Sequence, residues 1–430
     1  MPPTPTPKPV RLAIVGAGIR GAEAYGRWAL EHPAEAVVVA VAEPDDRRRQ
    51  RFAAQHALPP ELTFSDWREL LTHDRLADAL VVATPDRFHA EPTVCGLQLG
   101  YDILVEKPIA PTEAELEQVA QAAAAAGAGS VTVAHVLRHA PFVARIRGLL
   151  DQGRIGRLIA ISHHENVSYW HFAHSFVRGN WRRADQASPM LLAKACHDLD
   201  LLRWFAGAPC TSVSSVGGLH HFTADNAPAG APPRCTDGCP VADECPFYAP
   251  RFYVEQLYGV DGWPVSAITD DFSPEGRLRA LREGPYGRCV YRSDNDVADH
   301  QSVLLEFANG VTATLTVSAF TADNTRTIKL MGTRGEIRGR LDTGEVELRV
   351  FHPAAVEQLG VGGGEGHSGG DEALMAAFCA HVRRRRAGET DSASLTSLEV
   401  SLESHRLAFA AERARLEGRV VRPAVSDQGF

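Results

Sequence analysis

The feature that most constrains this chain is a glycine-rich turn placed directly after an apolar strand. Residues 10–15 (VRLAIV) have the length and composition of a buried strand, and the motif GAGIRG follows at residues 16–21. Apolar side chains at Ala22, Tyr25 and Ala29 then recur at helical spacing. A strand, a GxGxxG turn and a helix in this order are the fingerprint of a dinucleotide-binding βαβ unit. The sequence therefore predicts an open parallel sheet with a nucleotide at one edge.

The residues of this turn have separate predicted tasks. Gly16 makes the tight turn, Gly18 lets the backbone approach a pyrophosphate, and Gly21 lets the helix pack closely on the strand. A second apolar strand ends in Glu43, where a carboxylate can accept hydrogen bonds from ribose hydroxyls and repel a 2'-phosphate. NAD is therefore favoured over NADP. The arginines at 47–49 could instead clamp a phosphate, or they could form a solvated helix face.

Two further polar motifs follow buried strands. Residues 79–83 lead into the segment 84–89 (TPDRFH), and residues 101–105 lead into 106–108 (EKP). In an open parallel sheet the ligand crevice lies at the carboxyl ends of the strands, where both motifs fall. A fifth strand at 130–136 closes the nucleotide-binding half.

Lysine is rare in this chain. Only four of the 44 basic residues are lysines, and two of them, Lys107 and Lys194, lie in the most unusual motifs of the sequence. A lysine ammonium has an adjustable pKa, whereas a guanidinium does not deprotonate in a protein. Both lysines are candidate catalytic residues, although codon bias alone could leave a few lysines behind.

Length and composition limit the class of protein. A chain of 430 residues favours two domains, here residues 10–140 and 141–430 after a proline-rich, disordered tail at 1–9. The net charge of -9 argues against nucleic acid as a partner. No apolar run approaches the roughly 18 residues of a membrane span, and the tail lacks the apolar core of a secretory signal. We therefore expect a cytoplasmic protein with reduced cysteines.

The second half has the pattern of an α+β domain. Residues 155–170 and 299–350 alternate apolar and polar side chains as sheet strands do, and two amphipathic helices are expected at 372–386 and 394–417. In the loop before the first of these helices, Asp371 is a candidate helix N-cap.

An insertion at about 222–298 interrupts the strand pattern and carries clustered cysteines. Four thiols in reach of one another could bind a structural zinc ion that fixes a loop with little core of its own. The spacing C-x3-C-x5-C is less regular than paired CxxC motifs, so thiols without a metal are an equal alternative. The candidate zinc ligands are Cys235, Cys239, Cys245 and Cys289.

Aromatic, histidine and arginine side chains gather between residues 162 and 183. Arginines bind carboxylate, sulfonate or phosphate groups in a fork, so this segment is the candidate substrate wall and favours an anionic sugar. A surface loop with core aromatics is the alternative. The candidate substrate contacts in it are His164, Trp170, His174, Arg178, Trp181 and Arg182.

With these motifs in order, the chain resembles the Gfo/Idh/MocA family, the relatives of glucose-fructose oxidoreductase and inositol dehydrogenase. The matching residues are 16–21, 83–89 and 106–108, followed by a helix with His197 and Asp200. The resemblance implies an NAD(P)-binding Rossmann domain joined to an α+β domain with a large open, mostly antiparallel sheet, often assembled into homodimers or homotetramers. It also implies that Lys107 lies beside the nicotinamide and orients the substrate hydroxyl.

The chain departs from the family at this helix, where Ala193 replaces a common aspartate. Lys194 lies three residues before His197 and four before Asp198, so the three share one helix face. We predict that His197 is the acid/base, that Lys107 and Lys194 keep its imidazole neutral, and that Asp200 orients the helix. Alternatively, Lys194 and Asp198 form only an i,i+4 salt bridge.

The expected activity is removal of a hydride from a secondary hydroxyl of a sugar or cyclitol. Alternatives are a redox-neutral NAD-dependent glycosidase acting on a uronate or sulfosugar glycoside, and a non-catalytic NAD sensor.

Arg138 and His367 could also reach the substrate. Predicted cofactor contacts are Gly16, Gly18, Ile19, Arg20, Gly21, Glu43, Thr84, Pro85, Asp86, His89, Glu106 and Lys107; Lys107, Arg138, Lys194 and Asp198 join the substrate contacts above.

Overall fold

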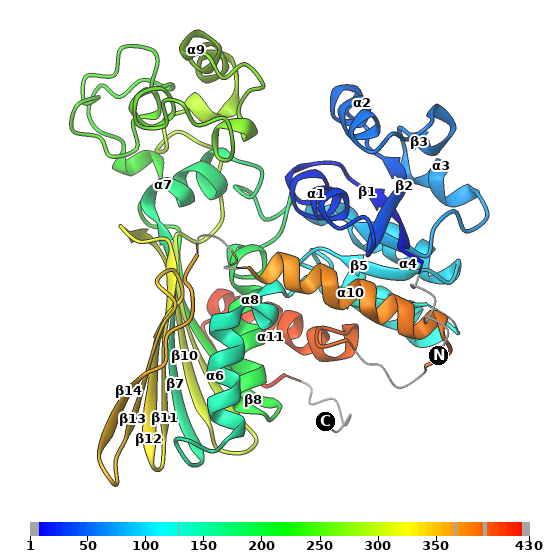
Figure 1. Cartoon of the computed structure of the whole chain (residues 1–430). Coiled ribbons are helices and arrows are strands. Elements are labelled where there is room, and N and C mark those ends of the chain that lie inside the picture. Colours follow the sequence, from blue (N-terminus) through cyan, green and yellow to red (C-terminus); the bar gives the residue numbers. More distant parts are fainter. Residues whose placement is uncertain (1–7, 128, 365–366, 368, 390–393, 424–430) are drawn as a thin grey trace.

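The computed structural model describes residues 8–127, 129–364, 367, 369–389 and 394–423 (Figure 1). Most of the predicted tail at 1–9 therefore lies outside the described residues.

The first domain is built on a six-stranded parallel sheet with the strand order β3-β2-β1-β4-β5-β6. The strands β4 and β5 are buried at every position because helices cover the sheet. This is the doubly wound order of a dinucleotide-binding fold, as predicted. The strands are β1 (Val10–Val15), β2 (Ala36–Ala42), β3 (Thr63–Phe64), β4 (Ala79–Val82), β5 (Asp102–Val105) and β6 (Ser130–Val133), and the helices are η1 (Ile19–Gly26), α1 (Arg27–Glu31), α2 (Asp46–Gln55), α3 (Trp67–Thr72), α4 (Ala90–Gln98) and α5 (Glu113–Ala125).

The second domain is built on an eight-stranded sheet with the order β14-β13-β12-β11-β7-β10-β9-β8. Only the β7–β10 pair is parallel, so the predicted mostly antiparallel sheet is confirmed. One face packs against helices α6, α8 and α11, and the other face is open (Figure 1). The elements are α6 (Pro141–Asp151), β7 (Leu158–Ser168), α7 (Tyr169–Phe172), η5 (Ala173–Arg178), α8 (Met190–Ala206), β8 (Cys210–Gly218), β9 (His300–Phe307), β10 (Thr312–Thr321), β11 (Thr325–Gly332), β12 (Gly335–Arg340), β13 (Glu345–Val350) and β14 (Ala355–Gln358).

The last two helices return from the second sheet to the first domain. Helix α10 (Gly370–Arg386) contacts β1, η1 and the turn η4 (Val136–His139), and α11 (Leu398–Glu417) lies between α8 and α5. Gly370 allows this approach, since a Cβ atom there would lie 2.3 Å from the carbonyl oxygen of Val136. The C-terminal helices thus tie the two domains together.

The insertion leaves the second sheet between β8 and β9, which are neighbouring strands, and forms the lobe that carries α9 (Pro274–Glu283) in Figure 1. Its centre is Arg277, a fully buried residue whose guanidinium donates hydrogen bonds to four backbone carbonyls. The acceptors are Tyr253, Leu257, Val260 and Phe272. This polar centre compensates for a small apolar core.

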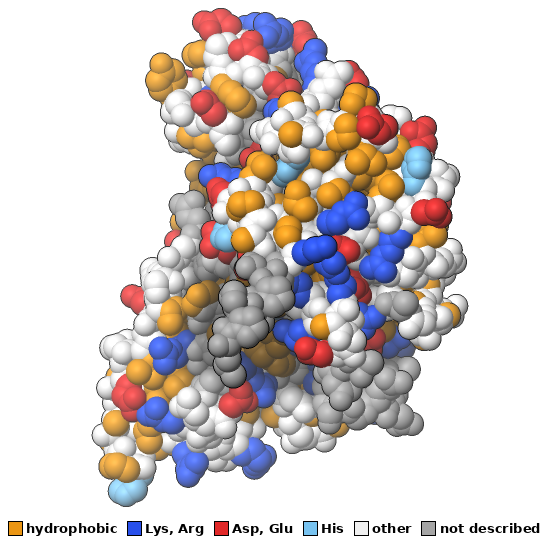
Figure 2. Space-filling view, turned by 45° about the vertical axis from the view of Figure 1, so that its right-hand side comes forward, with side chains coloured by type: hydrophobic (Ala, Val, Ile, Leu, Met, Phe, Trp, Pro, Cys, Tyr) orange, Lys and Arg blue, Asp and Glu red, His pale blue; other side chains and the backbone are white. Residues whose placement is uncertain are grey.

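Acidic and basic side chains are interspersed over the face seen in Figure 2. Among the described helices, none has the length and apolar character that crossing a membrane requires.

Candidate functional site

The glycine turn between β1 and η1 leaves room for a phosphate. Gly16 has a φ of +92°, and a Cβ atom there would lie 2.7 Å from the carbonyl oxygen of Ala83. A Cβ atom at Gly21 would lie 1.9 Å from the oxygen of Gly16, so the turn tolerates a side chain at neither position. Gly18, by contrast, has nothing within 4 Å of its Cβ position. The backbone at Gly18 is therefore open on the side where a pyrophosphate would approach, and the turn fits a dinucleotide.

Glu43 lies next to this turn at the end of β2. It is 4% exposed, and its carboxylate accepts a hydrogen bond of 2.8 Å from the Ala17 amide. Arg48 donates to the same carboxylate at 3.1 Å, and Arg49 donates to Asp46 and to the Glu43 carbonyl. Two of the three arginines that could have clamped a 2'-phosphate are thus engaged with local acceptors.

The EKP motif is anchored to the first helix. The guanidinium of Arg20 donates to Glu106 at 2.5 Å, and Tyr25 also donates to this carboxylate. Burial alone would raise the pKa of Glu106, but Arg20 and Tyr25 hold it below its ordinary value. Glu106 in turn accepts from the amide of Lys107. Ile19, 46% exposed, lies at the start of the same helix.

Lys107 and His197 meet between the domains. The ammonium of Lys107 donates to the carbonyl oxygen of Ala193 at 2.8 Å, one turn before His197 on α8. His197 is 3% exposed, and its Nε2 has no hydrogen-bond partner in the described part of the chain. Burial lowers the pKa of His197 well below 6.5, and the charge of Lys107 lowers it further. A buried, neutral and unpartnered imidazole nitrogen beside an ammonium has the properties of a general base.

Lys194 does not frame His197, contrary to the prediction. Its ammonium lies 3.3 Å from the carboxylate of Glu165 on β7, and Arg326 on β11 lies 2.8 Å from both Glu165 and Asp198. The i,i+4 pair with Asp198 is also absent, since Asp198 binds His163 and Arg326. Together, Lys194, Glu165, Asp198, His163 and Arg326 form what we call the β7 charge cluster. Asp198 is fully buried within it, so its surroundings favour a structural role over contact with a substrate.

The loop after β4 connects the domains. Asp86 accepts hydrogen bonds from the indole of Trp181 at 3.1 Å and from the Ser188 hydroxyl at 3.2 Å, both in the second domain. Pro85 precedes it, and Thr84 donates to the carbonyl of Phe88.

His89 is enclosed in the first domain. Both of its ring nitrogens lie within hydrogen-bond distance of backbone carbonyls, those of Pro108 and Thr84. Asp86, Trp181 and His89 are therefore committed to protein partners, and their placement favours a structural role.

Two more predicted substrate contacts point elsewhere. Arg138 is 5% exposed and forms a bidentate pair with Asp200 at 2.7 and 2.8 Å, so it fixes α8 and is not available to a ligand. His164 lies on the open face of the sheet, because side chains alternate along β7 and its neighbours His163 and Glu165 are the buried ones.

The arginines of the candidate substrate wall are paired within the chain. Arg178 is buried and donates to the carbonyls of Arg288 and Phe247, and Arg182 binds the carboxylate of Asp294. These contacts attach the insertion to the segment of Arg178 and Arg182. Because both guanidinium groups are occupied in this way, they no longer support the prediction of an anionic substrate.

The aromatic members of this segment pack together. His174 is 3% exposed and bonds the Tyr253 hydroxyl at 2.7 Å, and burial lowers its pKa to about 3. Trp170 is half-buried among His171, Phe252 and Trp263.

The structure does not support the predicted zinc site. Cys235, Cys239, Cys245 and Cys289 line one small cavity, and the segments of Cys235 and Cys289 are paired through a bridge between Arg234 and Arg288. Nevertheless, the described residues contain no group of three or more His, Cys, Asp or Glu side chains arranged to hold a metal ion. All four are free thiols around an apolar space.

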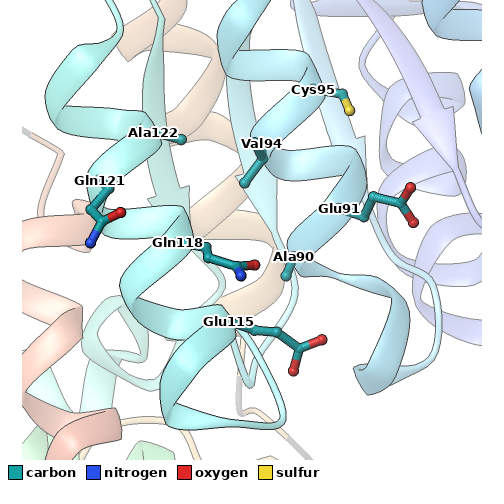
Figure 3. A pocket seen from close by; sticks show the side chains of 8 residues that line it. All are labelled: Ala90, Glu91, Val94, Cys95, Glu115, Gln118, Gln121 and Ala122. Carbon is teal, nitrogen blue, oxygen red and sulfur yellow. The ribbon is translucent and has the colours of Figure 1, made fainter.

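Several residues of the site escaped the sequence interpretation. His135, Glu165 and Arg326 come from three separate elements and meet α8 only in the folded chain. Asp371 is not a helix cap; it lies in the first turn of α10 and binds Arg20 and His367. A surface hollow between α4 and α5, lined by Glu91, Cys95, Glu115 and Gln118 among others, contains none of the candidate site residues (Figure 3).

The parallel sheet, its open glycine turn and the lysine–histidine pair define a two-domain, NAD(P)-binding oxidoreductase fold. More specifically, the chain belongs to the Gfo/Idh/MocA family. The model described as "oxidoreductase family, NAD-binding Rossmann fold" matches residues 10–135, and "oxidoreductase family, C-terminal alpha/beta domain" matches residues 147–354. The family membership expected from the sequence motifs is confirmed.

One relative is the oxidoreductase YteT of Bacillus subtilis, which is 25% identical over 65% of this chain and 63% of its own length. Inositol 2-dehydrogenase 4 of Saccharopolyspora erythraea is 29% identical over 51% of this chain and 60% of its own length. The chain thus aligns with less than two thirds of either relative.

Solved structures share the fold over nearly the whole chain. Levoglucosan dehydrogenase in complex with NADH and levoglucosan has a TM-score of 0.71 at 18% identity, covering 97% of this chain and 100% of that one. The myo-inositol 2-dehydrogenase from Lactobacillus plantarum has a TM-score of 0.66 at 16% identity with the same coverage.

Proposed function

We propose that this protein is an NAD-dependent dehydrogenase that oxidises a secondary hydroxyl of a sugar or cyclitol. The observation that carries the proposal is the unpartnered Nε2 of buried His197, which lies on α8 just beyond the carbonyl that holds the ammonium of Lys107. The names of the relatives support the substrate class, since they include inositol and levoglucosan dehydrogenases.

The nucleotide would lie along the carboxyl edge of the first sheet. The backbone at Gly18 would hold the pyrophosphate, and Glu43 would bind the adenosine ribose, which favours NAD over NADP. When bound, the nicotinamide supplies the hydride acceptor.

Lys107 and His197 would handle the substrate hydroxyl. An ammonium has three donors, and Lys107 uses one of them on Ala193, so two remain to orient the hydroxyl and stabilise its developing negative charge. His197 Nε2 would take the hydroxyl proton. Because this imidazole is neutral, it is in the form that can accept a proton at neutral pH.

The test is NADH formation with a panel of cyclitols, aldoses, uronates and anhydrosugars. His197→Ala should lower kcat by about 100-fold or more and leave NAD affinity within about twofold. A matched control is His352→Ala, which removes an exposed histidine in the turn after β13. Near-full activity of His197→Ala would refute the assignment.

The same assay separates the other candidate activities. Cleavage of a glycoside without net NADH would indicate the redox-neutral glycosidase. Tight NAD binding with no hydride exchange onto any compound of the panel would indicate the NAD sensor.

We also propose that the protein forms a homo-oligomer through the open face of the second sheet and works in the cytoplasm. Large apolar side chains are exposed on three adjacent strands of this face: Val216 at 67%, Leu304 at 53% and Phe320 at 46%. Light scattering of Leu304→Glu should show a smaller particle than the wild type, and an unchanged mass would count against this interface.

A further inference from the structure

A second histidine lies against His197. The rings of His197 and His367 meet edge-on, with centroids 5.6 Å apart and an interplanar angle of 66°. His367 comes from the segment before α10, 170 residues further along the chain. The contact therefore exists only because the C-terminal helices return to the first domain.

His367 is oriented by a carboxylate. Its Nδ1 lies 2.9 Å from Asp371, and Asp371 accepts a hydrogen bond of 2.5 Å from Arg20. Burial would raise the pKa of Asp371, but His367 and Arg20 hold it below its ordinary value, so the carboxylate stays ionised. A carboxylate on Nδ1 fixes the tautomer of an imidazole and leaves Nε2 free to exchange protons. The Nε2 of His367 has no hydrogen-bond partner in the described part of the chain.

His197 needs a route by which an accepted proton can leave. It is 3% exposed, and its Nδ1 faces the Nδ1 of His135 at 3.4 Å. That side is closed, because His135 has no exposed surface and its other nitrogen faces the buried Ser404. The His367 side chain, in contrast, is 28% exposed. Of these two neighbouring histidines, only His367 connects His197 to solvent.

We propose that His367, oriented by Asp371, relays the substrate proton from His197 to solvent. The inference rests on the proposed dehydrogenase function. A bound nicotinamide would supply the hydride acceptor, and the hydroxyl proton of the substrate would move to Nε2 of His197. The proton would then pass to Nε2 of His367, whose ring centroid lies 5.6 Å from that of His197, directly or through a water, and leave to buffer. His197 is neutral again for the next turnover.

The groups that face His367 set the balance of this relay. Asp371 from α10 and Glu106 after β5 favour the protonated ring; Arg20 from η1 opposes it, and His197 from α8 competes for the proton. Burial is the largest influence and lowers the pKa of His367, so the neutral ring, which can accept a proton from His197, is favoured. These are the properties of a relay rather than of a permanent cation.

The test compares His367→Gln with the control Glu372→Gln. The control changes an exposed carboxylate that lies next to Asp371 in the first turn of α10. In dilute buffer, His367→Gln should lower kcat by about 100-fold at unchanged NAD affinity, and added imidazole should restore most of the loss. Asp371→Asn should give a smaller loss with the same rescue. The control should behave as the wild type.

Full activity of His367→Gln at every buffer concentration would overturn the relay, as would a loss that imidazole does not restore in a variant with wild-type thermal stability. If the wild type forms no NADH with any compound of the panel, the proposed function fails, and the relay is then judged without substrate. Removal of His367 should raise the pKa of His197 in NAD-bound protein, measured by imidazole NMR. An unchanged titration would overturn the coupling on which the relay depends.

Discussion

Lys107 and Lys194 have different environments, although Lys107 contacts α8 and Lys194 belongs to this helix. Among the described residues, the ammonium of Lys107 donates to a backbone carbonyl alone, and its charge lowers the pKa of His197, whereas Lys194 is paired with Glu165. Lys107 is thus held by the backbone of α8 at Ala193. The carboxylate partner of the second lysine comes from β7.

This difference predicts the pH dependence of turnover. The acid limb of kcat/KM should lie well below pH 6.5, since His197 must stay neutral and its pKa is lowered first by burial and then by Lys107. Lys107→Met should move the His197 titration toward higher pH while kcat falls by about 100-fold. Imidazole NMR and kcat/KM profiles measure the two effects. A His197 titration that stays in place would show that Lys107 does not act on it electrostatically.

Lys194 should behave as a structural residue. Lys194→Met leaves buried Glu165 with only Arg326 as a close cation, and the pKa of Glu165, already raised by burial, should rise further. We expect a loss of about 1–3 kcal/mol in unfolding free energy, measured in urea. Lys194→Arg should recover part of it. A variant that keeps wild-type stability but loses kcat would instead make Lys194 catalytic.

At the scale of elements, the insertion is stabilised by one buried cation. Arg277 donates to four carbonyls, three within residues 253–260 and one at Phe272, so Arg277→Met would leave several buried acceptors without donors. We expect a loss of about 3 kcal/mol or more and early proteolytic cleavage within residues 222–298. Arg279→Met is the control, since its side chain is 57% exposed. Equal protease resistance of the two variants would contradict this role.

The elements differ in how much of them the sequence could predict. The glycine turn and the five predicted strands of the first domain are local patterns, and they fold where the sequence places them. On β7 the sequence showed alternation but not its phase, so His164 was chosen where His163 and Glu165 are the inward residues.

The prediction that the arginines of the candidate substrate wall contact substrate lacks support for a different reason. Their partners lie in the insertion, about 70 to 110 residues away, and no local pattern encodes such a pairing. The position of His367 beside His197 has the same long-range origin, because it depends on the return of α10 to the first domain.

At the scale of the whole molecule, many histidines are buried where helices join the domains and the insertion. Burial lowers the pKa of His135 and His197, and it lowers the pKa values of His174 and His405 to about 3. Through their hydrogen bonds, His135 and His197 connect α8 with α11, and His174 of η5 is connected with Tyr253 of the insertion. They are neutral in the native protein at pH 7.

The native state should therefore lose stability in mild acid. In the unfolded chain each histidine takes up a proton near pH 6.5, while His174 and His405 cannot do so in the native state until about pH 3. Their contribution is complete above pH 6.5 and is lost as the pH falls below it, at about 1.4 kcal/mol per pH unit for each ring. The paired carboxylates of Asp371 and Asp198 have lowered pKa values, so their contribution to stability is lost only below about pH 4, outside this window.

Urea unfolding at pH 7.5, 6.0 and 5.0 measures this slope. His405→Gln is the informative variant, because a glutamine oxygen can still accept the hydrogen bond that His405 receives from the Ile109 amide, yet it does not titrate. The slope below pH 6.5 should decrease by about 1.4 kcal/mol per pH unit in this variant. A wild-type stability that does not change between pH 7.5 and 5.0 would mean that the buried histidines reach protons without unfolding, and the closed side of His197 would then have to be open to solvent.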